Sequence, residues 1–357
     1  MIIKLLHFFA SLKLTVVLLS LLFVLVFAAT LDQVNLGIYY AVKTYFKSWL
    51  VWWAFPGGMT VGLSLFINLI CAHFIRFSWS SRKIGIWLTH TGLLLLIFGS
   101  AVTGFFAQES QLQLVEGQSK NYSEDFIDQE LAIYSAVSDT EDQVVAINLS
   151  DLPDAVESDL IPFSFTVDAI YMNARLRVLS EPKPEMTGVS AYLHLDPEPI
   201  DRRPDGQNHG AVIITLRDGS ETKTIVLSNL LGRPIQFGEH YLTIRPRRHY
   251  APYWIELIDF THDRYEGTDV PRHFASDVVV HDTDGPKTYK IFMNHPLRFK
   301  GQTYYQASFG KNDKMSVLQV VKNPGWLLPY ISCLVIALGM LIHFMGYLVR
   351  FLRREHA

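Results

Sequence analysis

Residues 84–108 read IGIWLTHTGLLLLIFGSAVTGFFAQ and contain no Asp, Glu, Lys or Arg over 25 positions. A charge-free apolar stretch of this length can cross the hydrocarbon core of a bilayer as a helix. His90 lies about six residues inside the stretch, which is roughly 9 Å of helix rise. A titratable side chain is costly to bury at that depth, so His90 is a candidate functional residue that needs a partner or a ligand.

The same stretch carries Gly85, Gly92 and Gly99, which recur every seven residues. Small residues at this spacing predict a face on which another helix packs closely. At about 100° per residue, His90 lies some 140–180° away from that face. We therefore expect His90 to point toward a different helix or another protein. The alternative, a packing histidine bonded to a neighbouring carbonyl, stays open.

Three further charge-free runs occupy residues 14–31, 51–75 and 323–349. Together they predict four transmembrane helices: three at about residues 13–31, 57–76 and 84–106, and the fourth within residues 323–357. Between the first two helices, residues 32–50 are interpreted as a short loop. The predicted domains are an N-terminal membrane region (1–106), a soluble domain (107–322), and a final helix with a basic tail (323–357).

Charge is distributed very unevenly between these parts. Residues 107–322 hold 21 Lys and Arg against 32 Asp and Glu, a balance of −11, whereas the rest of the chain holds 10 against 2, a balance of +8. The chain is thus predicted to be a membrane protein with an acidic soluble domain. Nucleic acid is not expected as a partner, because its recognition requires a basic face.

Basic residues also indicate the orientation. They lie at the N-terminus, in the link at residues 76–83, and at the C-terminal end. By the positive-inside rule, these segments face the cytoplasm. We therefore expect a multi-pass protein of the bacterial inner membrane whose large domain lies on the periplasmic side.

The soluble domain has the sequence pattern of a β structure. Apolar runs at residues 211–216 and 222–227 flank Arg-Asp-Gly-Ser, and those at 274–281 and 288–293 flank Asp-Thr-Asp-Gly, which are hairpin signals. Proline-rich residues 180–210 are interpreted as a long surface loop. The expected fold is an all-β sandwich or open barrel. Neither a disulfide framework nor a c-type cytochrome is expected, because the two cysteines, Cys71 and Cys333, lie in predicted helices and no CxxC occurs.

Several motifs resemble the ResB (CcsB) family of System II cytochrome c biogenesis. The strongest lie between residues 253 and 310. The pieces are SLKLT (11–15), LTHTG (88–92), FASD (274–277), MNHPL (293–297), GQTYYQAS (301–308) and NPG (323–325). The resemblance implies the same order of elements: three spans, a large exposed domain and one more span.

The resemblance also implies a function. ResB-type proteins pair with a multi-span, tryptophan-rich partner called ResC or CcsA, move haem across the membrane, and help to attach it to apocytochrome c. A membrane-anchored thioredoxin-like protein is a further expected partner. Thioether chemistry would lie mostly in ResC or CcsA, so this chain is expected to be an accessory subunit, and no catalytic residue is assigned to it. The implied cofactor is transiently bound haem b.

His90 occupies the place of the third-span histidine that the family is proposed to use as an iron ligand, and neutral imidazole is a good ligand for haem iron. His73 and His343 also fall within roughly 5–10 Å of the inner boundary and are weaker candidates. His343 lies between Gly339 and Gly346, which suits plain helix packing. The cations Arg76, Arg82 and Lys83 could meet haem propionates or simply set the topology.

Other polar groups of the soluble domain are expected to be structural or to bind a partner. His295 precedes a proline and is expected to shape a turn. The basic cluster Arg245, Arg247, Arg248 and His249 either binds a partner or decorates a strand end. Two other functions stay open: a structural scaffold that stabilises a partner without binding haem, and a stand-alone membrane enzyme or receptor.

Overall fold

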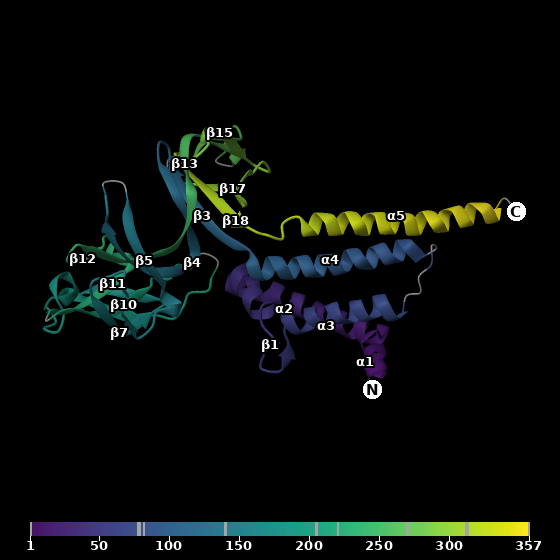
Figure 1. The fold of residues 1–357 in the computed structure, drawn as a ribbon, viewed down its shortest axis with the longest axis horizontal. Helices are drawn as coiled ribbons and strands as arrows, with labels where there is room; N and C mark the ends of the chain where they lie inside the picture. Colours follow the sequence, from purple (N-terminus) through teal and green to yellow (C-terminus); the bar gives the residue numbers. More distant parts are fainter. Residues whose placement is uncertain are drawn as a thin grey trace. The chain divides into compact units, whose positions relative to one another are not determined.

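The computed structural model describes residues 2–76, 80, 83–138, 141–203, 206–219, 221–268, 271–310 and 314–355. The chain divides into two compact units (Figure 1). The helical unit comprises Met1–Gln108, Arg202–Pro204 and Lys322–Ala357, and the β unit comprises Glu109–Asp201 and Asp205–Val321. We describe each unit by itself.

The helical unit contains five α-helices and one π-helical turn in the described chain: α1 Ile2–Phe9, α2 Leu12–Tyr45, α3 Gly58–Cys71, η1 Ala72–Arg76, α4 Ile84–Phe106 and α5 Leu328–Glu355. Four segments are long and apolar enough to cross a membrane: Leu12–Tyr45, Gly58–Arg76, Ile84–Phe106 and Leu328–Arg353. The four predicted spans are confirmed, and the chain is built as a multi-pass membrane protein.

The loop expected at residues 32–50 is wrong, because α2 continues to Tyr45. The helix is kinked at Gly37, whose φ of 67° and ψ of 163° are not helical. Glycine adopts positive φ without the steric cost that a Cβ would impose. The Tyr45 hydroxyl donates a hydrogen bond across the kink to Asp32 Oδ2 at 2.5 Å. Charged and polar residues beyond position 31 predicted a loop. The backbone is instead helical on both sides of the kink at Gly37, so α2 extends past the apolar run.

The α1–α2 elbow is held by polar side chains from α3 and η1. The amide nitrogen of Asn68 donates to the carbonyls of Phe9 and Ser11, and Arg76 Nη1 donates to the carbonyl of Ala10 at 3.1 Å. The Thr15 hydroxyl donates to Asn68 Oδ1 at 2.7 Å. Carbonyls at the end of a helix have no partner within it, so these bonds satisfy groups that would be costly in an apolar environment.

Helices α4 and α5 run side by side (Figure 1) and touch through the predicted glycine face. A Cβ built on Gly85 would lie 2.6 Å from the backbone nitrogen of His343, and one on Gly92 would lie 2.5 Å from Ile336 Cγ1. A Cβ on Gly99 would lie 2.8 Å from Leu328 Cβ. Such distances leave no space for a larger residue, so the glycines allow the two backbones to approach closely.

The β unit is built from a ten-stranded sheet, a four-stranded sheet and a hairpin. Its strands are β3 Gln108–Val115, β4 Ser119–Ala136, β5 Asp142–Asn148, β6 Ala155–Val156, β7 Ser164–Tyr171, β8 Ala174–Val178, β9 Leu193–Pro197, β10 Ala211–Asp218, β11 Glu221–Ser228, β12 Ile235–Phe237, β13 His240–Arg264, β14 Pro271–Asp282, β15 Gly285–Phe292, β16 Leu297–Phe299, β17 Gln302–Phe309 and β18 Met315–Lys322. Both predicted hairpins are present, as β10–β11 and β14–β15.

The large sheet has the order β15-β14-β13-β4-β3-β18-β17-β16, with β5 paired to β4 and β12 paired to β13. Strands β15 and β16, at the two ends of this order, contact each other, so the sheet curls into a nearly closed barrel. A second region is a sandwich, in which the four-stranded sheet β11-β10-β7-β6 packs against β4, β5, β12 and β13. The prediction named a sandwich or an open barrel, and the β unit contains both.

Two long strands, β4 and β13, serve both regions (Figure 1). Leu242 and Ile244 of β13 lie in the sandwich core, whereas Ile255 and Leu257 of the same strand lie in the barrel core. The β4–β13 register shifts between Pro246 and Arg248, and again between Tyr250 and Ile255. Proline cannot donate to a ladder and is tolerated inside a sheet at such a bulge.

The surface loop expected at residues 180–210 is partly wrong. It contains a 3₁₀ turn, Gly188–Tyr192, followed by β9, which pairs with β8 over five residue pairs. Leu193 and Leu195 alternate into a small core beneath the hairpin. The prolines indicated a loop, but Pro197 is tolerated at the last pair of the hairpin, opposite Ala174.

We predict that Gly92→Val lowers the apparent melting temperature of the detergent-solubilised chain. The added side chain must displace Ile336 or separate α4 from α5, at a cost of about 1–3 kcal/mol. Gly104→Val is the matched control, because a Cβ at Gly104 meets nothing within 4 Å on the same helix. Equal melting temperatures for the two variants would contradict the close contact between the helices.

Candidate functional site

His73 lies in the π-helical turn η1 at the end of α3, and its side chain is 4% exposed. Its ring packs edge-on against Trp87 of α4, with 3.8 Å between the ring centroids. Phe74 adds a further edge contact to His73 at 5.2 Å. A π-turn changes which way the side chains of a helix point and is often found at functional positions. Here it occurs where His73 meets α4.

His90 lies one turn after Trp87 on α4 and is half-buried. His73 contacts Trp87, and Trp87 is one helical turn from His90 on the same helix. Helices α3 and α4 contact each other, so the two histidines come from neighbouring elements. The structure therefore places two of the three predicted site residues on contacting elements, and Trp87 of α4 links them: it touches His73 and lies one turn before His90. Sequence reasoning missed Trp87, whose only signal was its position three residues before His90.

A hydrogen bond sets the tautomer that His90 would use. Its Nδ1 lies 2.9 Å from the carbonyl oxygen of Ile86, one turn earlier in α4. A carbonyl accepts only, so Nδ1 carries the proton and Nε2 carries the lone pair. Histidine ligands in metal sites are usually oriented by such a second bond. The same bond is also what a packing histidine makes inside a helix.

His343 is on the opposite side of α4. Its backbone packs on Gly85, on the glycine face, and its ring contacts Phe344 and Tyr347 of its own helix at centroid distances of 5.5 and 4.8 Å. Five residues separate Gly85 from His90, so the two point about 140° apart on α4. The contacts of His343 are those of a helix-packing residue.

The cations proposed at the membrane edge are placed differently. Arg76 donates to the Ala10 carbonyl and so helps to hold the α1–α2 elbow. Lys83 is exposed just before α4, and Arg82 lies outside the described residues. Among the residues that the structure describes, no group of three or more His, Cys, Asp or Glu is arranged to hold a metal ion.

The donor set at His73 and His90 is chemically suited to haem. Haem iron is commonly held by imidazole nitrogen, and one or two ligands suffice because the macrocycle supplies the other four. Both histidines lie in segments apolar enough to span a membrane, where an apolar macrocycle is compatible with its surroundings. A chelating cluster of carboxylates and thiols would indicate a bare ion instead.

In the β unit, the predicted basic cluster is largely neutralised by β4. Arg245 Nε lies 2.9 Å from Glu130 Oε1, and Arg248 Nε lies 3.1 Å from Glu124 Oε1. The guanidinium of Arg248 also stacks over the Tyr122 ring at 4.0 Å. These pairs lie on either side of the Pro246 bulge, so Arg245 and Arg248 hold the two long strands together.

His249 faces Asp125, with 3.6 Å between Nε2 and Oδ2. Burial acts to raise the pKa of Asp125, but the nearby His249 side chain and hydrogen bonds from the amides of Ile127 and Asp128 outweigh it and hold the pKa below its ordinary value. Asp125 is therefore charged near neutral pH, and its bonds fix the path of β4.

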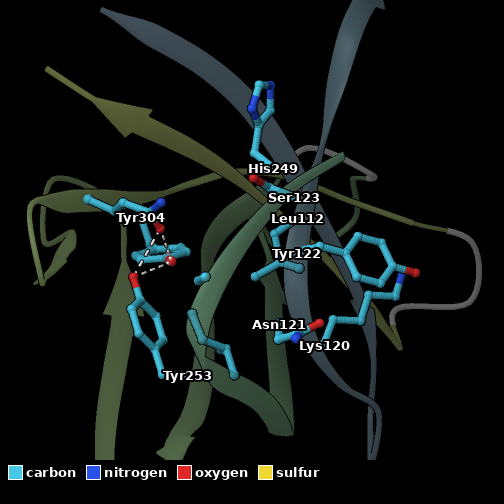
Figure 2. A pocket seen from close by; sticks show the side chains of 11 residues that line it. Leu112, Lys120, Asn121, Tyr122, Ser123, His249, Tyr253 and Tyr304 are labelled. Carbon is cyan, nitrogen blue, oxygen red and sulfur yellow. Dashed lines mark hydrogen bonds between the residues drawn. The ribbon is translucent and has the colours of Figure 1, made fainter. Parts of the chain in front are cut away.

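The barrel interior contains a polar network, drawn in Figure 2. The hydroxyls of Tyr253 and Tyr304 lie 2.9 Å apart, and both donate to Gln302 Oε1, at 2.9 and 2.6 Å. Burial raises the pKa of Tyr253 and raises that of Tyr304 further, so both stay neutral at ordinary pH. The adjoining cavity measures about 10 Å³, the space of one water molecule, so this network is structural.

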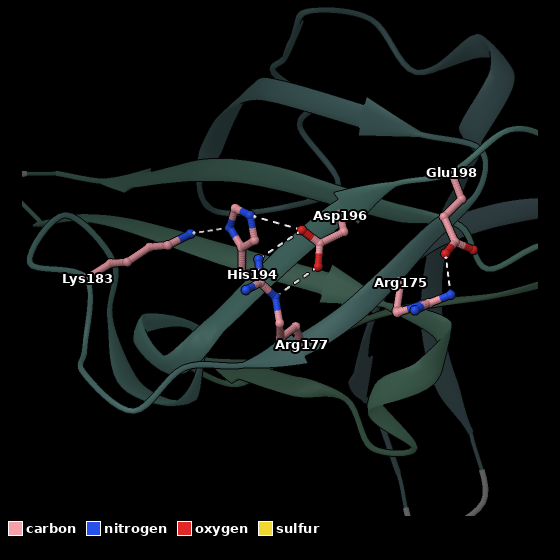
Figure 3. Close-up of polar contacts among 6 residues, drawn as sticks. All are labelled: Arg175, Arg177, Lys183, His194, Asp196 and Glu198. Carbon is pink, nitrogen blue, oxygen red and sulfur yellow. Dashed lines mark hydrogen bonds and ion pairs between the residues drawn. The ribbon is translucent and has the colours of Figure 1, made fainter.

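Figure 3 shows the charged surface of the β8–β9 hairpin. Arg177 donates two bonds of 3.0 Å to Asp196, and His194 lies between Lys183 and that carboxylate. The bidentate bond from Arg177 holds the pKa of Asp196 below its ordinary value. Arg175 pairs with Glu198 at 2.7 Å. All of these ion pairs are exposed and tie the hairpin together without forming a cleft.

His295 lies at the turn between β15 and β16, as expected. Its ring stacks on Phe292 with 4.6 Å between centroids and 6° between planes, and the two residues exchange backbone hydrogen bonds. Asn294, between them, has a φ of 62°, a left-handed conformation that asparagine tolerates better than most residues.

The match to a protein-family model lies in the β unit. Residues 206–317 match the model of the ResB-like family, which confirms that resemblance over this region. Protein NrfI of Wolinella succinogenes is 27% identical over 112 residues, which are 31% of this chain and 12% of that protein. The match thus spans about an eighth of the length of this relative. His73, His90 and His343 all lie outside the residues matched by the family model.

Among solved structures, the chain aligns with "Cytochrome c Heme Lyase CcmF" over 90% of its length and 34% of that protein, at 12% identity. The TM-score is 0.21. Similarity at that level shows neither a shared fold nor a shared function.

We predict that His295→Ala lowers the melting temperature of the chain by removing the stack on Phe292, worth about 0.5–1.5 kcal/mol. His194→Ala is the control, because His194 is exposed in a surface ion-pair group, where such contacts contribute little. A loss of stability as large in the control as in His295→Ala would contradict this assignment.

Proposed function

On the premise that residues 206–317 of this chain are ResB-like, we propose that it is a subunit of a membrane complex that assembles c-type cytochromes. Its cargo would be haem b, delivered across the membrane and presented with apocytochrome c for covalent attachment. The proposed partners are a ResC- or CcsA-type multi-span protein and a membrane-anchored thioredoxin-like protein. Within that complex the chain would be an accessory subunit, because thioether formation is assigned to its partner.

One observation carries the haem part of the proposal: His73 of one membrane segment packs on Trp87 of the next, one helical turn from His90. Ionisable residues within a membrane segment are functional candidates by default, because burying them without a purpose is costly. Two such residues on contacting helices, linked through one tryptophan, favour a shared ligand over two independent packing roles.

The roles of the two histidines follow from their contacts. His90 would bind iron through Nε2, because Nδ1 is bonded to the Ile86 carbonyl. His73, buried against Trp87, would be the second nitrogen donor or would orient the macrocycle. Haem supplies the iron and the vinyl groups for the partner's chemistry, and this chain's residues bind, orient and shield it. His343 would be the weaker candidate for this role, because its backbone packs on the glycine face.

The orientation is proposed from charge. Lys4, Lys13, Arg76, Lys83 and Arg350 lie at the ends of helices on the side expected to face the cytoplasm, and the β unit is acidic. The β unit would then face the periplasm of a bacterial inner-membrane protein, where haem attachment to cytochromes takes place. There it would hold the apocytochrome or a partner near the haem.

A structural scaffold is the second candidate. It is favoured by the His90–Ile86 bond, which a packing histidine would also make. In that case the chain would stabilise its partner but would not bind haem itself. A Soret absorption band on the purified complex that depends on His90 distinguishes the two candidates.

For topology, we predict that an activity reporter fused after Arg354 is active in the cytoplasm and that one inserted near residue 207 is active in the periplasm. The positive-inside rule is the physical reason. Reporters that are active on the same side of the membrane would contradict the four-span arrangement.

For haem, we predict that His90→Ala and His90→Gly lower the affinity of the purified complex for haem at least about tenfold, since even loss of a residue that only supports a ligand costs this much. The Soret band measures the effect, and free imidazole should partly restore it in His90→Gly. His73→Ala should alter the same band.

His343→Ala is the matched control for haem binding, because it removes an imidazole from the glycine face of α4 without touching His73 or His90. It should leave the band unchanged. Full haem content and full cytochrome assembly in His90→Ala would show that His90 is a packing residue, and the scaffold reading would then stand.

A further inference from the structure

A cavity of about 480 Å³ opens at the edge of the sandwich. Its lining residues belong to the β unit, whereas the candidate haem histidines belong to the helical unit. Its walls come from β10, β11 and β12, from the segment that precedes β12, and from the start of the 3₁₀ turn Gly188–Tyr192. The volume is within the range of about 300–1,000 Å³ that is usual for small-molecule sites. No contact or function described above uses this cavity.

The floor of the cavity is the sandwich core itself. Leu216, Ile225 and Phe237 line it, and all three are buried members of that core. Leu231 and Ile235 continue the apolar wall toward the surface. These side chains form the apolar base of the cavity, on which the apolar part of a ligand could pack.

The charged residues that line the cavity are both basic, Lys223 and Arg233. Lys223 Nζ lies 5.4 Å from the centroid of Phe237, above the floor, and Arg233 lines the cavity from the segment that precedes β12. No Asp or Glu is among the lining residues, although residues 107–322 carry a net charge of −11. Lys223 also pairs with Glu221 at 2.5 Å, but this pair is largely exposed and so binds weakly enough to be replaced by a ligand anion.

The neighbouring edge of β11 argues against a peptide strand as the occupant. The Thr224 carbonyl already accepts from the Thr187 amide at 3.2 Å, and the Val226 amide donates to Ser190 Oγ at 2.9 Å. A strand added there would have to break these bonds. An alkyl chain requires no hydrogen bonds and loses nothing at such a covered edge.

Haem is also a poor fit, because the lining contains no His, Cys, Met or Tyr that could ligate iron. We propose that this cavity binds a long-chain fatty acid, with its alkyl chain on the apolar floor and its carboxylate at Lys223 and Arg233. An apolar body with one anionic head matches a dry floor with cations at the rim. The proposal is independent of the haem function.

The test uses the full-length chain in phosphatidylcholine nanodiscs and a diazirine-bearing palmitic acid, with the cross-linked peptides identified by mass spectrometry. We expect labelling within residues 187–190 or 231–237, with unlabelled palmitate competing for it. The corresponding diazirine-bearing alcohol should label these peptides at least about tenfold less, because it lacks the charge-assisted bonds. Equal labelling by acid and alcohol would overturn the role of the cations.

Two variants and one control complete the design. The double variant Lys223→Gln, Arg233→Gln should lower labelling at least about tenfold. Val189→Trp fills the cavity from an exposed lining position and should abolish labelling while leaving the melting temperature unchanged. Arg217→Gln removes an exposed cation of β10, and this cation does not line the cavity. This variant should be labelled to the same extent as the unaltered chain.

Labelling confined to the helical unit, or labelling of these peptides that persists in Val189→Trp, would show partition into the bilayer or non-specific contact and would overturn the proposal. A palmitate-competed label that is lost in both cavity variants and retained in Arg217→Gln would establish the site.

Discussion

The pairing of β4 with β13 is the interaction on which the β unit depends. Each strand is long enough to pass through both the sandwich and the barrel, so the two cores share one ribbon of backbone hydrogen bonds. The ribbon changes direction at Pro246, where a missing amide is tolerated because the ladder is already interrupted. Ion pairs from Arg245 and Arg248 to β4 hold the register on both sides of the bulge. Loss of this register would turn core residues outward in both regions at once.

In the helical unit, α4 divides its surface between packing and a candidate site. Three glycines face α5 so closely that no side chain fits between the backbones. The face that carries Trp87 and His90 instead meets η1 and His73. A close and rigid contact on one side fixes the rotation of α4, and the rotation determines where His90 points. The proposed haem ligand therefore depends on glycines that never approach it.

Charge organises the chain on a larger scale. Basic residues gather at helix ends and acidic residues in the β unit, which supports the proposed orientation. Within the acidic unit, cations that face β4 are paired, as Arg245 and Arg248 show. No acid lines the cavity at Lys223 and Arg233, and Lys223 pairs with Glu221 in a largely exposed ion pair outside that lining. A lining that holds cations and no acid favours an anionic ligand.

The sequence by itself determined the four spans, the glycine face of α4, and the hairpins β10–β11 and β14–β15, because each follows from a short-range pattern of apolar, small and turn residues. It did not determine the extension of α2 beyond Asp32. The hydropathy pattern ends there, but the helix continues through polar residues and a kink at Gly37 to Tyr45. Nor did it determine the β4–β13 register or the meeting of His73 with His90. These join residues far apart in the chain, and only the packing of whole elements decides which distant side chains become neighbours.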